Sequence, residues 1–205
     1  MPCQLRNQLR NQLRNALSLA LLALGAVVPG LRAEVAPAAP ATPTSGYRAE
    51  YLTALEDVQS KLTELAQAVP ADKYSWRPAE GVRSVAEVYD HVASGNYFIP
   101  TMIGVPAPAG VSKDLEKESD KAKVIAALKA SIEHVRRALL VTSDTDLEKK
   151  VKMFGREASE REVFSLLMNH LHEHLGQSIA YARMCGVVPP WTAREQQPKP
   201  AATKP

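Results

Sequence analysis

The chain has 205 residues, a formal net charge of +3 and only two cysteines, Cys3 and Cys185. Four arginines and no acid lie in residues 1–33, so removing these four charges leaves the rest of the chain at −1. Without an excess of Lys and Arg to neutralise phosphates, the sequence argues against nucleic acid as a partner. A single cysteine beyond residue 33 excludes an internal disulfide there, so the fold must depend on its apolar core.

Residues 1–33 have the composition of a secretory signal peptide. They begin with a basic stretch that contains QLRN three times, continue with the apolar run ALSLALLALGAVVPG, and end at the small residue Ala33. This order is typical of a segment removed during export. The apolar run is short for a membrane span, although an uncleaved N-terminal anchor is the alternative. We therefore expect a periplasmic or secreted protein without a stable membrane span after cleavage.

Composition divides the rest of the chain into three parts. Residues 34–46 are rich in Pro, Ala and Thr and predict a flexible linker, and residues 192–205 predict a disordered Pro-rich tail. The region between them, residues 47–191, has the usual size of one domain.

Apolar spacing and punctuation predict four helices in this domain, over residues 47–69, 84–99, 119–141 and 159–185. The sequences SVAE at Ser84 and SERE at Ser159 are capping boxes that begin the second and fourth helices. The patches at 151–154 and 187–188 are too short to build a sheet. Residues 99–118 form one long connection, so the pattern predicts an all-α, four-helix bundle with a crossover between helices 2 and 3.

The stretch NHLHEHLGQ places three histidines in the fourth helix. At about 100° per residue, His170 and His174 share one face, whereas His172 points about 200° away from His170. Two imidazoles at this spacing can meet one metal ion. His91, in the second helix, is the natural third ligand, and we expect His134, which lies among charged residues, to be solvated. The face that we expect to turn inward comprises Val163, Leu166, Leu167, His170, His174, Gln177, Tyr181 and Met184.

A competing motif overlaps the same stretch. Residues 170–174, HLHEH, also match H-x-x-E-H, the inverted zinc-protease signature, in which Glu173 would be the base. That signature needs a further acidic ligand downstream, and only Glu195 follows in this sequence. We therefore interpret the match as coincidental.

Several motifs together resemble the DinB (damage-inducible) superfamily, which includes the YfiT-like metalloenzymes. They are WRP at 76–78, the histidine that follows SVAEVYD, H-x-x-x-H-x-G-Q at 170–177, and Y-x-R-x-x-G-x-x-P-P at 181–190. The resemblance spans about residues 47–191. It implies a four-helix bundle that holds one divalent ion, zinc or nickel, through His91, His170 and His174.

The resemblance implies less about the reaction. Characterised relatives resemble thiol S-transferases that use bacillithiol, mycothiol or glutathione, or related isomerases. Three imidazoles and one water form the open arrangement of catalytic zinc. Glu173 is our candidate for a proton carrier. Gln177 is a candidate partner for a ligand histidine, because metal-bound imidazoles generally need one, and Tyr181 is expected to pack in the core.

Three hypotheses remain open at this point. The first is a metal-dependent enzyme, either a hydrolase or a thiol S-transferase, acting on a small-molecule substrate that the sequence does not identify. The second is a non-catalytic metal-binding or stress-response module. The third is a structural bundle whose histidines are only hydrogen-bonded. The sequence also leaves open whether the protein is a homodimer.

We predict that natively expressed protein begins near Glu34 and is found outside the cytoplasm, because residues 1–33 have the signal-peptide order. N-terminal sequencing of protein purified from its own cells checks this. An intact Met1 on cytoplasmic protein would contradict the prediction.

Overall fold

A computed structural model of the protein describes residues 41–112 and 114–197. This part of the chain is mostly helical, and its long helices are α2 (Gly46–Ala68), α3 (Val85–Phe98), α4 (Lys121–Val141) and α5 (Glu160–Met184). Each agrees with a predicted helix to within about two residues, and the all-α class is confirmed. The predicted signal peptide, most of the linker and the last eight residues lie outside the described residues.

Shorter elements connect and flank these helices. They are the 3₁₀ turns η1 (Ala71–Lys73), η2 (Ile99–Ile103), η3 (Leu115–Lys117) and η4 (Asp146–Glu148), the strands β1 (Lys150–Met153) and β2 (Arg156–Ser159), and the C-terminal helix α6 (Pro190–Glu195). In the described residues, no helix is both long enough and apolar enough to cross a membrane.

The helix ends follow the predicted signals. At the start of α3, the Ser84 hydroxyl accepts a hydrogen bond from the backbone N–H of Glu87, whose carboxylate accepts from the backbone N–H of Ser84. Ser159 and Glu162 form the same reciprocal pair at the start of α5. Both capping boxes are confirmed, and each satisfies two N–H groups that the helix itself cannot.

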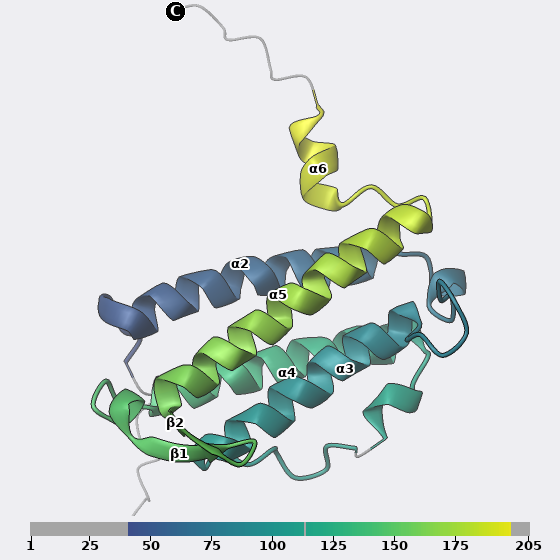
Figure 1. Ribbon diagram of the computed structural model, residues 1–205. Coiled ribbons are helices and arrows are strands. Elements are labelled where there is room, and N and C mark those ends of the chain that lie inside the picture. Colours follow the sequence, from purple (N-terminus) through teal and green to yellow (C-terminus); the bar gives the residue numbers. More distant parts are fainter. Residues whose placement is uncertain (1–40, 113, 198–205) are drawn as a thin grey trace, which may run out of the picture. The chain divides into compact units, whose positions relative to one another are not determined.

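The long helices pack as a bundle around one apolar core (Figure 1). Helix α3 contacts both α4 and α5, and α2 contacts the same two helices. The connection between α3 and α4 is long, as predicted, and carries η2 and η3; both contact α3, and η2 also contacts α5. This crossover therefore places a loop beside the face of α3 that also meets α5.

The prediction that no sheet forms near residues 151–154 was wrong. Strands β1 and β2 make an antiparallel hairpin in which Lys150 pairs with Ser159 and Met153 with Arg156. Its turn consists of Phe154 and Gly155, both with positive φ, of 48° and 84°. Such turns favour Asn or Gly at both positions, so an exposed phenylalanine gave no hairpin signal.

The predicted tail also needs a correction. Residues Pro190–Glu195 form α6, so the first part of the stretch 192–205 is helical in the structure. Proline at the first position of this helix carries no N–H that would be left without an acceptor. An ion pair between Arg194 and Glu64 of α2, at 2.8 Å, holds the short helix against the bundle.

His134 is buried, with only 3% of its surface exposed, although we predicted that it would be solvated. It lies three residues after the buried Ser131 and four before the buried Ala138, so helical rotation turns it inward despite its charged neighbours in sequence. Its ring packs near that of Tyr97, with centroids 5.3 Å apart. Neither ring nitrogen has a hydrogen-bond partner among the described residues.

We predict that His134 makes the fold sensitive to acid. Burial, with a smaller contribution from the positive charge of Arg137, lowers the pKa of His134 below its ordinary value. The unfolded chain then binds a proton that the folded chain does not, so stability is complete above about pH 6.5 and falls as the pH decreases below it. In His134→Leu, urea denaturation should show a smaller loss of stability between about pH 7 and about pH 5.

The matched control is His172→Leu, because His172 is exposed and should leave the pH dependence of the wild-type protein unchanged. Equal pH dependence in the wild type and His134→Leu would contradict the prediction.

Candidate metal centre

Three histidines from two helices meet at one place in the bundle. His91 lies on α3, and His170 and His174 lie one turn apart on α5. One nitrogen of each ring lies within 4.8 Å of the others. The ring centroids are 5.1 Å apart for His91 and His170, 4.8 Å for His91 and His174, and 4.6 Å for His170 and His174. We call these three residues the histidine cluster.

Helical rotation on α5 separates the cluster from its neighbours. His172 is exposed, and its Nδ1 lies 3.0 Å from the carbonyl oxygen of Met168 in the same helix. The buried face of α5 is centred on Leu167, Leu171 and Ser178, so His170 lies toward its edge. The face that we predicted to be buried is therefore rotated relative to the face that the structure buries. Its last residue, Met184, is 63% exposed. An edge position leaves the cluster accessible from one side.

Gly95 on α3 makes room for His170. A Cβ atom at this glycine would lie 2.4 Å from Cε1 of the His170 ring, closer than real Cβ contacts occur. Gly95 is four residues after His91, so both face α5. We did not predict a role for this residue. A glycine inside a helix, one turn after a candidate ligand, was nevertheless a usable signal, because glycine weakens a helix unless packing requires it.

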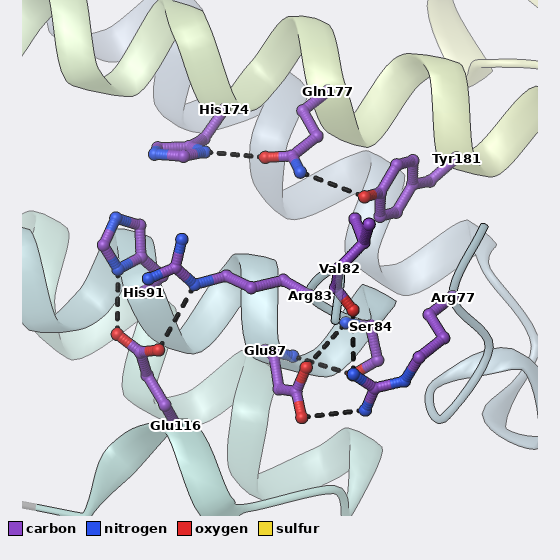
Figure 2. A network of polar contacts seen from close by, with 10 residues as sticks. All are labelled: Arg77, Val82, Arg83, Ser84, Glu87, His91, Glu116, His174, Gln177 and Tyr181. Atoms are coloured by element: carbon purple, nitrogen blue, oxygen red, sulfur yellow. Dashed lines mark hydrogen bonds and ion pairs between the residues drawn. The ribbon is translucent and has the colours of Figure 1, made fainter. Parts of the chain in front are cut away.

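Oxygen atoms bind two of the rings on the side away from the cluster (Figure 2). Nδ1 of His91 donates to Oε1 of Glu116 at 2.8 Å, and Nδ1 of His174 donates to Oε1 of Gln177 at 2.8 Å. Gln177 in turn donates from Nε2 to the hydroxyl of the buried Tyr181, at 3.1 Å. Because each Nδ1 carries the proton, each Nε2 keeps a free lone pair. The predicted hydrogen bond between Gln177 and one of the candidate histidines, His174, is present.

Glu116 is a second residue that sequence analysis missed. It lies in η3, on the crossover between α3 and α4, 25 positions from its partner His91. Its other oxygen accepts a hydrogen bond from Nε of Arg83 at 3.3 Å. Burial raises the pKa of Glu116, but the hydrogen bonds from His91 and Arg83 outweigh this and hold its pKa below the ordinary value. No spacing rule connects a loop carboxylate to a helical histidine, so this contact could not be predicted from residue spacing.

The surroundings keep His170 and His174 uncharged. Burial, followed by the charges of His174, His91 and Arg83, lowers the pKa of His170 to about 4. Burial also lowers the pKa of His174. Neutral imidazole is the form that binds metal, so His170 and His174 are prepared for coordination at neutral pH.

The cluster fits a divalent cation in its donor set. Nδ1 of His170 is buried and has no hydrogen-bond partner among the described residues. A buried polar atom without a partner costs about 1–3 kcal/mol. Three imidazoles, two of them fixed by oxygen acceptors, match the ligands and the outer hydrogen bonds of zinc sites.

Glu173, our candidate proton carrier, and several other polar or aromatic residues lie outside the cluster. Glu173 is exposed on α5. Asn96 donates to the hydroxyl of Ser131 at 3.0 Å. Asp90 is fully buried, neither of its carboxylate oxygens has a partner among the described residues, and it lines a separate cavity of about 300 Å³. Burial, with the charges of nearby glutamates, raises its pKa to about 7. Trp76 packs edge-on against Tyr181, with centroids 5.5 Å apart.

Comparisons with known proteins agree with this fold. Residues 54–178 match the family model of the DinB superfamily. The YjoA protein of Bacillus subtilis (strain 168) is 25% identical over 126 residues, which cover 60% of this chain and 80% of that protein.

Two solved structures have the same fold. A DinB-like protein from Bacillus cereus ATCC 10987 superposes with a TM-score of 0.61 at 17% identity, and DinB-like YjoA from Bacillus subtilis with 0.55 at 22% identity. In both cases the match covers 68% of this chain and 93% of the other.

We predict opposite effects for two glycine substitutions. Gly176 lies on α5, and a Cβ there would meet nothing within 4 Å. Gly176→Ala should therefore gain the usual helix preference of alanine, about 0.5–1 kcal/mol, and raise the melting temperature by about 2–4 °C. In Gly95→Ala, the contact of the new methyl group with the His170 ring should cancel this increase in stability. The NMR signals of the ring should also shift, because the ring must move. If both variants gained stability equally and the ring signals stayed in place, the close approach would be wrong.

Proposed function

This chain belongs to the DinB superfamily, and on that premise we propose that it is a metalloprotein in which His91, His170 and His174 hold one divalent ion, zinc or nickel. The observation that carries the proposal is the orientation of the rings. His91 and His174 each give Nδ1 to an oxygen acceptor, and this leaves Nε2 of both rings free within the cluster. Such outer hydrogen bonds fix the tautomer and orientation that a metal ligand needs.

The exposure of the site favours an enzyme over a purely structural metal site. The side chain of His91 is 26% exposed, and that of Glu116 is 41% exposed. Catalytic sites keep a coordination position open to water or substrate, whereas structural sites are closed by four protein ligands. The cluster provides three protein ligands, and a fourth is absent from it among the described residues. A bound ion of this kind lowers the pKa of water and polarises a carbonyl group.

The protein's own residues would orient and shield the reacting groups. Gln177 and Tyr181 form a chain of hydrogen bonds that fixes His174 from one side. Glu116 fixes His91 from the other side. Glu173 is exposed and adjacent to His174, and its charge acts on that ring. It therefore stays our candidate for accepting a proton from the attacking nucleophile, which is water in a hydrolase and a thiol in an S-transferase.

The proposed export favours the hydrolase. Low-molecular-weight thiols are scarce outside the cytoplasm, so a periplasmic or secreted protein would meet water far more often than a thiol. Cys185 does not provide a substitute, because burial raises the pKa of its thiol and it is not a member of the histidine cluster. The alternative is a non-catalytic metal-binding module, which would hold the ion without exchanging water for substrate.

We predict that purified protein contains about one divalent ion per chain. Replacing His91, His170 or His174 with Ala should weaken binding by more than about a hundredfold, because loss of a direct ligand costs more than loss of its outer partner. His172→Ala is the matched control, since it removes an exposed imidazole from the same helix and should retain full metal content. Elemental analysis of the four variants, with circular dichroism to show that each is folded, makes the measurement.

The His91 variant decides between the three-histidine site and the inverted zinc-protease motif. In that motif His91 is dispensable and Glu173 is essential. Full metal content in folded His91→Ala would contradict the proposed site.

A further inference from the structure

Arg83 places a positive charge beside the histidine cluster. It precedes the N-cap residue of α3, and its side chain extends along that helix toward His91 (Figure 2). Its Nε donates to one oxygen of Glu116 at 3.3 Å, while the other oxygen of the same carboxylate accepts from His91 at 2.8 Å. One carboxylate thus holds the guanidinium group next to the ring of His91.

Most of the hydrogen-bonding capacity of Arg83 is unused. A guanidinium group has five N–H donors, and only Nε makes a hydrogen bond to the described residues. Its side chain is 42% exposed, so the two terminal nitrogens are accessible. Arg77, which lies seven residues before the N-cap residue Ser84, differs in this respect. It is 40% exposed, but its terminal nitrogens donate to the carbonyl of Val82 and to Glu87.

The charge balance of the site favours an anion. The three imidazoles are acceptors without charge when they bind a cation. Glu116 hydrogen-bonds to the cluster but already pairs with Arg83, and Glu173 adds one further negative charge beside His174. A divalent ion held there would still keep part of its positive charge uncompensated. The free fork of Arg83 adds donors whose geometry matches two oxygens of one anionic group.

We propose that Arg83 binds an anionic oxygen group of the substrate, either a carboxylate or a phosphate, at the histidine cluster. This inference rests on the proposed function, because it concerns the ligand of the same site. Arg83 would then be a specificity-determining residue that selects small anionic molecules. A different role, in which Arg83 only positions Glu116, predicts an effect on metal binding and none on anion binding.

The test uses the full chain loaded with Co²⁺, whose visible spectrum reports ligands that enter the coordination sphere. Metal content is measured first, and sodium acetate and sodium phosphate are then titrated at constant ionic strength. We expect Arg83→Met to weaken binding of the preferred anion by about tenfold or more, because this is the usual effect of losing one charge-assisted hydrogen bond. Arg83→Lys should lie between Arg83→Met and the wild type, because it keeps the charge and loses the fork.

Arg77→Met is the matched control. It removes one arginine of similar exposure that also pairs with a glutamate, and anion binding should stay within about twofold of the wild type. Preference for acetate assigns a carboxylate group to the substrate, and preference for phosphate assigns a phosphate group; both support the inference.

Three outcomes would overturn it. These are wild-type protein that binds neither anion, Arg83→Met that binds anions as tightly as the wild type, and Arg83→Met that loses the metal itself, which assigns a positioning role. Absence of metal from the wild-type protein is distinguishable from all three, since it defeats the proposed function and this inference together.

Discussion

The close approach of α3 and α5 is the constraint on which the site depends. His91 and its two partners belong to different helices, so their rings can meet only where the two backbones come near each other. Gly95 makes this possible, because the His170 ring occupies the space that any larger side chain would fill. Packing of the apolar core sets the distance between the two helices. At that distance, the absence of a side chain on Gly95 leaves room for the imidazole of His170. Packing and chemistry are therefore linked at one position.

The two sides of the cluster are held differently. His174 is fixed by Gln177 and Tyr181, which follow it at helical spacing on α5. These contacts are local and should persist as long as that helix does. His91 is fixed by Glu116, which belongs to the crossover loop and is half exposed. Loops are generally more mobile than the helices that they join. The His174 side is thus built rigidly, and the His91 side is able to respond to what enters the site.

Much of this molecule could be predicted from its sequence because the relevant signals are local. Helix ends followed from capping boxes and from prolines, and the orientation of His170 and His174 away from His172 followed from a rotation of about 100° per residue. Gln177 was also predictable, since it lies three residues from the ring that it binds. In each case the physical cause lies within one or two turns of the residue concerned.

The errors and omissions have non-local causes. The Phe154–Gly155 turn is strained for phenylalanine, and it forms because the strands beside it pack on the bundle. His134 is buried because α4 turns it toward α3, against the indication of its charged neighbours. Glu116 meets His91 through the fold of a long loop. Such contacts depend on where the whole chain goes, and neither residue spacing nor composition encodes them.

The contact between Gly95 and His170 also couples the two positions in evolution. A chain that keeps histidine at 170 in this orientation is expected to keep glycine at 95, because even one added methyl group meets the ring. A chain that replaces this histidine with a smaller residue frees the space, and alanine then becomes the better helix former at 95. Among related sequences the two positions should therefore vary together. Related proteins that lack this glycine would then be those that keep the helical bundle but have lost the histidine cluster.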